Sequence, residues 1–157
     1  FKQKTAYEIS LGLVGSEMCI RDRHKLVSQS TSIPISTGEN EYTRYGFRDL
    51  IEGRCVSILQ PDPLIMGGIT EIQKVAAMAH AHDLPISPHG NQDIGVHVVA
   101  GVPNGLTVEY YRASTDPMYD LWCKEPLRVD NGVVHPPERP GLGIELNDEV
   151  LKDLRVG

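Results

Sequence analysis

The sequence lacks the features that mark several common classes of protein. Its three cysteines, Cys19, Cys55 and Cys123, lie far apart and form no C-x-x-C pair. An odd number of cysteines at such spacings fits neither a disulfide framework nor a structural zinc site. We therefore expect reduced thiols, as in a cytoplasmic protein.

Runs of basic residues are also missing. The formal net charge is −6 at pH 7, and no segment is rich in Lys and Arg. Proteins that bind nucleic acid need a positive patch to neutralise phosphates, so we expect no nucleic-acid partner. No membrane span, internal repeat or low-complexity tract is present. With 40% hydrophobic and 23% charged residues, the 157-residue composition is ordinary for a soluble globular protein with one core.

The first 23 residues differ in character from the remainder. Their apolar patch is short, interrupted by glycine and followed by charged residues, which argues against a signal peptide. The segments KQKTAYEI (2–9) and LVGSEMCIRDR (13–23) resemble in-frame translations of the constant parts of a sequencing adapter, with residues 10–12 as its index. We interpret 1–23 as a non-natural segment in preference to a natural leader. We expect it to make no coherent packing with the rest, which would then be a gene fragment.

From His24 onward, short β-rich runs alternate with helical patterns, which is typical of βα units and a parallel sheet. Thr70, after a Gly-Gly pair, is a plausible N-cap for the second helix. We predict an α/β fold, half of a (β/α)₈ barrel with about four parallel strands over residues 24–111, and an irregular C-terminal segment over 112–157. The predicted strands are 33–36, 56–60, 84–87 and 106–111, and the predicted helices are 43–52, 70–79, 93–102 and 147–154.

Functional residues of such barrels lie at the carboxyl ends of the strands. Four residues there can carry chemistry: Glu39, Asp62, His89 and Glu109, separated by 23, 27 and 20 residues. These intervals are close to one βα unit each, so all four should face the same end of the barrel. Taken singly, each is more often an ordinary loop residue, and only their convergence favours a site.

The four residue types suit acid–base chemistry beside a metal ion. Glu39 offers the hard oxygen ligand that Mg²⁺ prefers. Asp62 and His89 could form a hydrogen-bonded pair that gives or takes a proton near neutral pH. Glu109 could bind a substrate oxygen through a hydrogen bond.

Several motifs in the same order resemble the mandelate racemase group of the enolase superfamily. They are GENEYTRYGFRDLIEGR (38–54), SILQPD (57–62), GGITEIQKVAAMA (67–79), LPISPHG (84–90) and VEYY (108–111). Through residue 79 the likeness is to rhamnonate-type sugar-acid dehydratases. NQDIGVHVVAGVPNG (91–105) is more similar to other acid-sugar dehydratases of the group.

The resemblance implies roles for the four residues in the C-terminal half of the barrel. Glu39 matches a metal-binding carboxylate on the fifth strand. Asp62 and His89 match an Asp–His dyad on the sixth and seventh strands, and Glu109 matches the eighth-strand glutamate. PERPGLGIEL (137–146) is similar to the segment that returns to a capping domain.

The function implied is that of a Mg²⁺-dependent lyase, a dehydratase that converts a sugar acid into a 2-keto-3-deoxy sugar acid. A racemase or epimerase could use the same dyad, and a non-catalytic truncated half-barrel is the other alternative. The resemblance places two metal carboxylates, a lysine motif and the capping domain upstream of His24. We therefore expect this fragment to be inactive alone. In the intact enzyme we expect a small-molecule sugar acid as partner, no membrane and a homo-oligomer.

Overall fold

The computed structural model describes residues 17–155, with side chains from residue 21 onward. Strand β1 (Ser36–Thr37) pairs in parallel with β2 (Ile58–Leu59). Single parallel bridges then join Leu59 to Ile86 and Ile86 to Gly105. Each of the four predicted β-rich runs therefore lies at or beside a parallel contact, in chain order. The regular pairing is much shorter than predicted, but the α/β class is confirmed.

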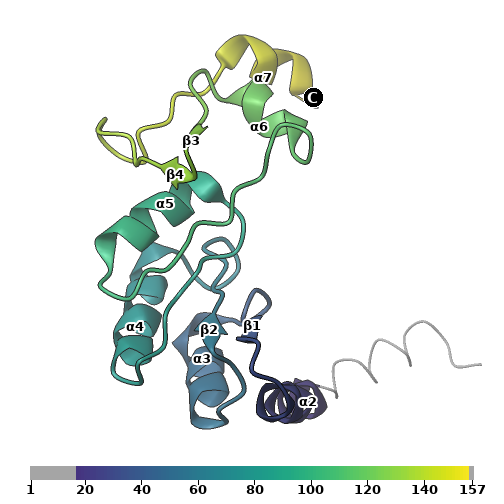
Figure 1. Ribbon diagram of the computed structural model, residues 1–157. Coiled ribbons are helices and arrows are strands. Elements are labelled where there is room, and N and C mark those ends of the chain that lie inside the picture. The colour runs from purple at the N-terminus through teal and green to yellow at the C-terminus, as the bar shows by residue number, and fades with distance from the viewer. Residues whose placement is uncertain (1–16, 156–157) are drawn as a thin grey trace, which may run out of the picture.

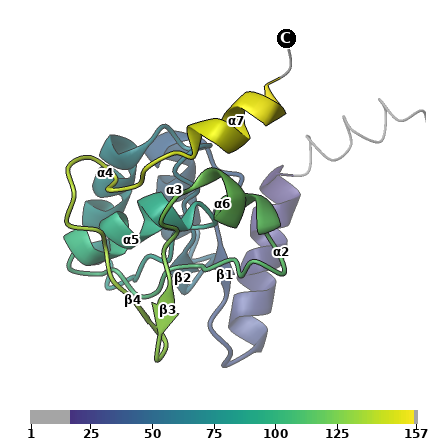
Figure 2. The ribbon, with the colours of Figure 1, turned by 90° about the horizontal axis from the view of Figure 1, so that it is seen from above.

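Helices connect these extended segments and lie together on one side of them (Figures 1 and 2). They are α3 (Thr43–Glu52), α4 (Ile69–His80) and α5 (Gln92–Gly101). Helix α3 has the predicted bounds. Helix α4 begins one residue before the predicted N-cap Thr70, because Gly68, at φ +84°, occupies the cap position. The prediction of Thr70 as N-cap is wrong.

The core lies between these helices and the parallel segments. Apolar residues three or four positions apart on α3 and α4 form one buried stripe on each helix. These stripes pack on Leu59 and Ile86, which are completely buried in the parallel contacts. The largest members of the core are Phe47, Leu50, Leu59, Met66, Ile72, Val75 and Ile86. Because the core fixes the extended segments, it also fixes the loops that follow them.

Helix α2 (Glu17–Ser30) crosses the predicted boundary at residue 23. Arg21, inside the segment interpreted as foreign, donates to Glu41 at 2.9 Å and to Asp49 at 3.0 Å. The expectation that residues 1–23 make no coherent packing with the rest stays untested, although Arg21 does contact the fold through these ion pairs. Residues 1–16 lie outside the described residues, as does the side chain of Ile20. The origin of this segment stays a prediction.

The C-terminal segment is more regular than predicted (top of Figure 1). It contains α6 (Pro117–Trp122), an antiparallel hairpin of β3 (Val129–Asp130) and β4 (Val133–Val134), and α7 (Asp148–Leu154). Only α7 was predicted. Among residues 17–155, no helix is both long enough and apolar enough to cross a lipid bilayer. Cys55 and Cys123 are buried and free.

Candidate functional site

The pairing register places the candidate residues at the same end of the parallel segments. Leu59 is paired with Ile86, and Asp62 and His89 each lie three residues farther along the chain. The backbone N–H of His89 donates to the carbonyl of Pro61 at 3.0 Å, which joins the two loops. Glu39 and Glu109 follow the neighbouring segments at the same end. The predicted convergence of four strand-end residues is therefore present in the backbone.

His89 lies between two glutamates and makes no ion pair with Asp62. Its Nδ1 atom is 2.8 Å from Oε2 of Glu109 and 3.4 Å from Oε2 of Glu39. Nδ1 is buried, and neither contact has the alignment of a hydrogen bond. Two acidic groups therefore lie on the Nδ1 side of the imidazole.

Asp62 has a different set of partners from those predicted. Its Oδ1 accepts from the backbone N–H of Leu64 at 2.7 Å, from that of Ile65 at 3.3 Å and from Nδ2 of Asn91 at 3.2 Å. Asp62 is only 7% exposed, so these donors offset the cost of burying its carboxylate. The hydrogen bond that Asp62 and His89 could form is absent from this structure. The reason is local: an aspartate before a turn readily accepts the N–H groups two and three residues ahead.

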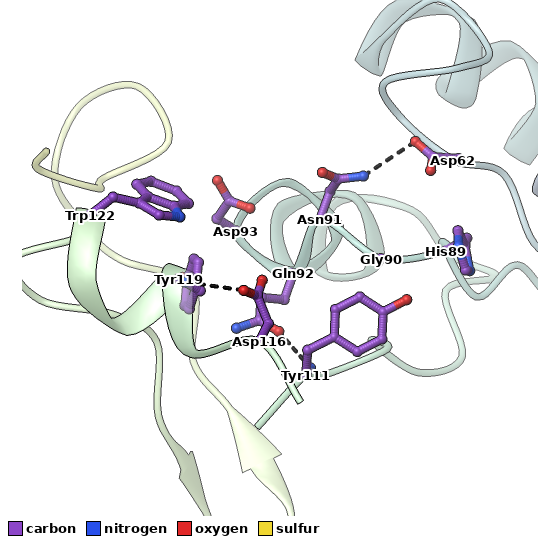
Figure 3. A pocket seen from close by; sticks show the side chains of 10 residues that line it. All are labelled: Asp62, His89, Gly90, Asn91, Gln92, Asp93, Tyr111, Asp116, Tyr119 and Trp122. Atoms are coloured by element: carbon purple, nitrogen blue, oxygen red, sulfur yellow. Dashed lines mark hydrogen bonds between the residues drawn. The ribbon is translucent and has the colours of Figure 1, made fainter. Parts of the chain in front are cut away.

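Asn91 is a residue of the site that the sequence analysis missed. It adopts the left-handed conformation, with φ 44° and ψ 53°, directly before α5. Asparagine tolerates this conformation better than most residues, and its amide reaches Asp62 (Figure 3). Gly90, its neighbour, donates its N–H to Oε2 of Glu109 at 2.7 Å. The loop that carries His89 is thus held by two carboxylates from neighbouring segments.

Tyr111 adds a second unpredicted group to the same end of the fold. Its backbone N–H donates to Oε1 of Gln92 at 2.6 Å. Burial raises the pKa of the Tyr111 hydroxyl, and the negative charge of Glu109 raises it further. Two tyrosines, at 110 and 111, were visible in the sequence as part of VEYY, but nothing there indicated which one faces the site.

The described residues do not form a complete metal site. No group of three His, Cys, Asp or Glu side chains within them is placed to hold a metal ion. Glu39, the predicted Mg²⁺ ligand, is 47% exposed and faces His89. A single carboxylate is a poor match for a cation that demands near-octahedral oxygen coordination. The donor set of residues 17–155 therefore does not fit magnesium without further ligands.

Residues 17–150 match the family described as enolase C-terminal domain-like, and the chain belongs to that family. The chain is 38% identical over 136 residues to the D-xylonate dehydratase of Haloferax volcanii, covering 83% of this chain and 33% of that protein. It is 41% identical over 122 residues to the L-rhamnonate dehydratase of Saccharopolyspora erythraea, covering 74% and 31%. The chain thus spans about a third of the length of these curated relatives.

A solved structure shows the same similarity in three dimensions. The L-talarate dehydratase of Polaromonas sp. JS666, in complex with Mg and L-glucarate, superposes with a TM-score of 0.74 at 30% identity. The match covers 84% of this chain and 36% of that one. These three relatives are named as dehydratases of sugar acids, and dehydratases are hydro-lyases. Together with the family match, this confirms the enolase-superfamily class that the sequence motifs indicated.

Proposed function

We propose that this chain carries part of the active site of a sugar-acid dehydratase, an enzyme that removes water from a sugar acid to give a 2-keto-3-deoxy sugar acid. The names of the relatives support the reaction class. The observation in this molecule that best supports it is the 2.8 Å approach of Glu109 to Nδ1 of His89. That contact places a carboxylate beside an imidazole at the end of the sheet where βα-barrel enzymes carry their chemistry.

His89 is the proposed catalytic acid. In dehydration, a base removes the proton α to the carboxylate, and the β-hydroxyl then leaves as water after accepting a proton. Glu109 and Glu39 lie on the Nδ1 side of His89. We assign proton donation to the Nε2 side, because no described residue hydrogen-bonds to that atom. A racemase or epimerase would instead return the proton to the α-carbon.

Asp62 is proposed as a positioning residue. It does not touch His89 through a hydrogen bond, but it holds Asn91 two residues farther along the same loop. Glu109 holds Gly90 in the same way. Glu109 thus has two proposed tasks, to orient the imidazole and to hold the loop backbone, and binding a substrate oxygen would compete with both.

We propose magnesium binding only for the whole protein. We propose Glu39 as one ligand, in line with the magnesium in the talarate dehydratase complex. Further ligands must come from outside the described residues, which form no three-residue cluster. We therefore expect the 157-residue chain by itself to release no keto acid from sugar acids, with or without Mg²⁺. Turnover by the purified chain above that of a mock preparation would contradict this.

A chimera tests the catalytic assignment. Residues 33–155 of this chain replace the matching segment of the H. volcanii D-xylonate dehydratase, and keto-acid release from D-xylonate is measured in the presence of Mg²⁺. We expect turnover, and we expect His89→Gln to reduce it by about 10²–10⁴-fold, the usual contribution of a positioned acid or base.

His82→Gln is the matched control, because His82 is exposed after the end of α4. Equal turnover of the His82 and His89 variants would rule out His89 as the acid. A folded chimera that isomerises sugar acids without releasing keto acid would replace the dehydratase assignment with the racemase or epimerase alternative.

A further inference from the structure

A cavity of about 280 Å³ extends from the candidate site toward the C-terminal segment. Asp62 and His89 line one end of it, and Trp122 of α6 lies at the other (Figure 3). Between them the wall is formed by the start of α5 and the start of α6. The groups proposed for catalysis thus occupy only one end of the cavity.

Gln92 is the most informative residue of this wall. It is 3% exposed, and its Oε1 atom accepts from the N–H of Tyr111 at 2.6 Å, which fixes the orientation of the amide. Its Nε2 atom is buried and has no well-aligned hydrogen-bond partner among the residues described, although it interacts weakly with the hydroxyl of Tyr119. A buried donor without an acceptor is costly, so its retention needs an explanation. An oxygen atom of a ligand in the cavity would provide a well-aligned acceptor.

The charges around the cavity restrict what that ligand can be. Asp62, Asp93 and Asp116 line it, and no Lys or Arg does. Carboxylates accept hydrogen bonds from hydroxyl groups and repel other carboxylates. Asp116 uses Oδ1 to accept from the backbone N–H of Tyr119 at 3.3 Å, which leaves Oδ2 available. The cavity therefore disfavours the charged end of an acid and favours an uncharged part that carries hydroxyl groups.

A metal ion is a poorer candidate, because the amide N–H₂ of Gln92 would be directed at a cation and the described residues form no three-ligand cluster. Aromatic groups support a polyol instead. Tyr119 and Trp122 pack edge to face, with ring centroids 5.2 Å apart. Such rings offer an apolar surface for the C–H groups of a hydroxylated chain, while the carboxylates and the amide bind its hydroxyls.

We infer that this cavity binds the uncharged polyol portion of the ligand, with Gln92 donating to a hydroxyl oxygen and Asp93 and Asp116 accepting from hydroxyl hydrogens. The link to sugar acids rests on the proposed function, but polyol binding itself does not depend on turnover. It would direct the carboxylate of a sugar acid away from the three aspartates. Gln92 and Asp116 then become residues that determine which hydroxylated chain is accepted.

The test uses the 157-residue chain and its single tryptophan, Trp122, which reports on the cavity through its fluorescence. The probes are xylitol, which is a neutral polyol, and propionate, which has a carboxylate and no hydroxyl. We expect xylitol to change the emission of Trp122 in a saturable way in the millimolar range, and propionate to leave it unchanged. No saturable response to xylitol, or an equal response to propionate, would overturn the inference.

Two variants locate the binding. Gln92→Glu keeps the acceptor for Tyr111 but replaces the N–H₂ donor, and Asp116→Asn keeps a helix-capping side chain but removes the charge. We expect xylitol binding to weaken about three- to tenfold in each, the usual effect of losing one hydrogen bond. Asp83→Asn removes a charge at an exposed turn outside the cavity and should bind like the parent chain. Far-UV circular dichroism checks that each variant is folded. Folded cavity variants that bind xylitol as tightly as Asp83→Asn would refute the assignment, whatever the chimera does.

Discussion

Gly38 joins the end of β1 to Glu39, and a side chain there should disturb both the fold and the site. Its φ is +134°, and a Cβ atom would lie 2.6 Å from Cε1 of Phe47 and 3.3 Å from the backbone nitrogen of Gln60. The Phe47 ring is completely buried. It cannot move aside without displacing other core residues, because protein interiors are close-packed.

The expected loss of stability in Gly38→Ala is the sum of two separate energetic costs. Backbone strain at such a φ costs about 1–3 kcal/mol, and overpacking a core costs about 1–3 kcal/mol. We therefore expect Gly38→Ala to lower the free energy of unfolding by about 2–6 kcal/mol. Domains are usually stable by about 5–15 kcal/mol, so this is a large fraction of the total. Urea unfolding followed by far-UV circular dichroism measures it, provided that the slope of the transition stays constant.

Two other glycines separate the costs. Gly68 has φ +84° but no atom within 4 Å of a Cβ, so Gly68→Ala should show the strain alone, about 1–3 kcal/mol. Gly101, the last residue of α5, also has no atom within 4 Å. Gly101→Ala should be neutral or stabilising by about 1 kcal/mol. If Gly38→Ala and Gly68→Ala agree to within about 0.5 kcal/mol, no packing cost exists at Gly38 and the reasoning fails.

Three further predictions use the same unfolding assay. The hydrogen bond from Lys74 lowers the pKa of Glu71 to about 2 from 4.5, so its contribution is present above pH 4.5 and lost as the pH falls toward 2. Glu71→Gln should remove this part of the acid dependence, and an unchanged pH profile would contradict it. Burial raises the pKa of Tyr119 to about 12 from 10, so stability should fall as the pH rises from 10 through 12. Tyr119→Phe should show a smaller fall over that interval, and an equal fall would count against the shift. Deletion of residues 1–23 should cost at most about 2 kcal/mol, because it removes two partly exposed ion pairs of Arg21. A larger loss would argue that this segment belongs to the fold.

The helices were predictable because their apolar spacing is set by packing on a single core. Phe47, Leu50 and Ile51 repeat at helical spacing, and the bounds of α3 follow from them. The strands were predictable in order but not in length. A parallel contact of one or two residues needs only a short β-rich run, and sequence pattern does not show where pairing stops.

The missed elements had signals that the prolines obscured. Asn131–Gly132 is a favoured hairpin dipeptide, and it joins β3 to β4. Asp116 followed by Pro117 combines an N-cap with a proline at the first helical position, and α6 begins there. Scattered prolines made residues 112–157 look irregular in sequence. The Asn-Gly and Asp-Pro dipeptides are nevertheless specific signals for a hairpin turn and for a helix start.

Residue spacing in the sequence determines some features of the candidate site, and local backbone geometry determines others. Convergence of Glu39, Asp62, His89 and Glu109 follows from register, because residues two to four positions after paired residues lie at one end of a parallel sheet. Side-chain partners do not follow from register. A carboxylate at a strand end can bind groups of the site or accept from the N–H groups of the turn that follows it. A sequence pattern does not show which of these partners it has.

At Asp62 the turn provides the partners, and this changes how the site is built. Its carboxylate holds the N–H groups of Leu64 and Ile65 and the amide of Asn91, so it fixes two loops at once. Glu109 fixes Gly90 between Asn91 and His89. The position of the imidazole therefore depends on its loop, which neighbouring segments hold at Gly90 and Asn91. Exchange of either Asp62 or Glu109 for an apolar residue should displace His89, although Asp62 makes no ion pair with it.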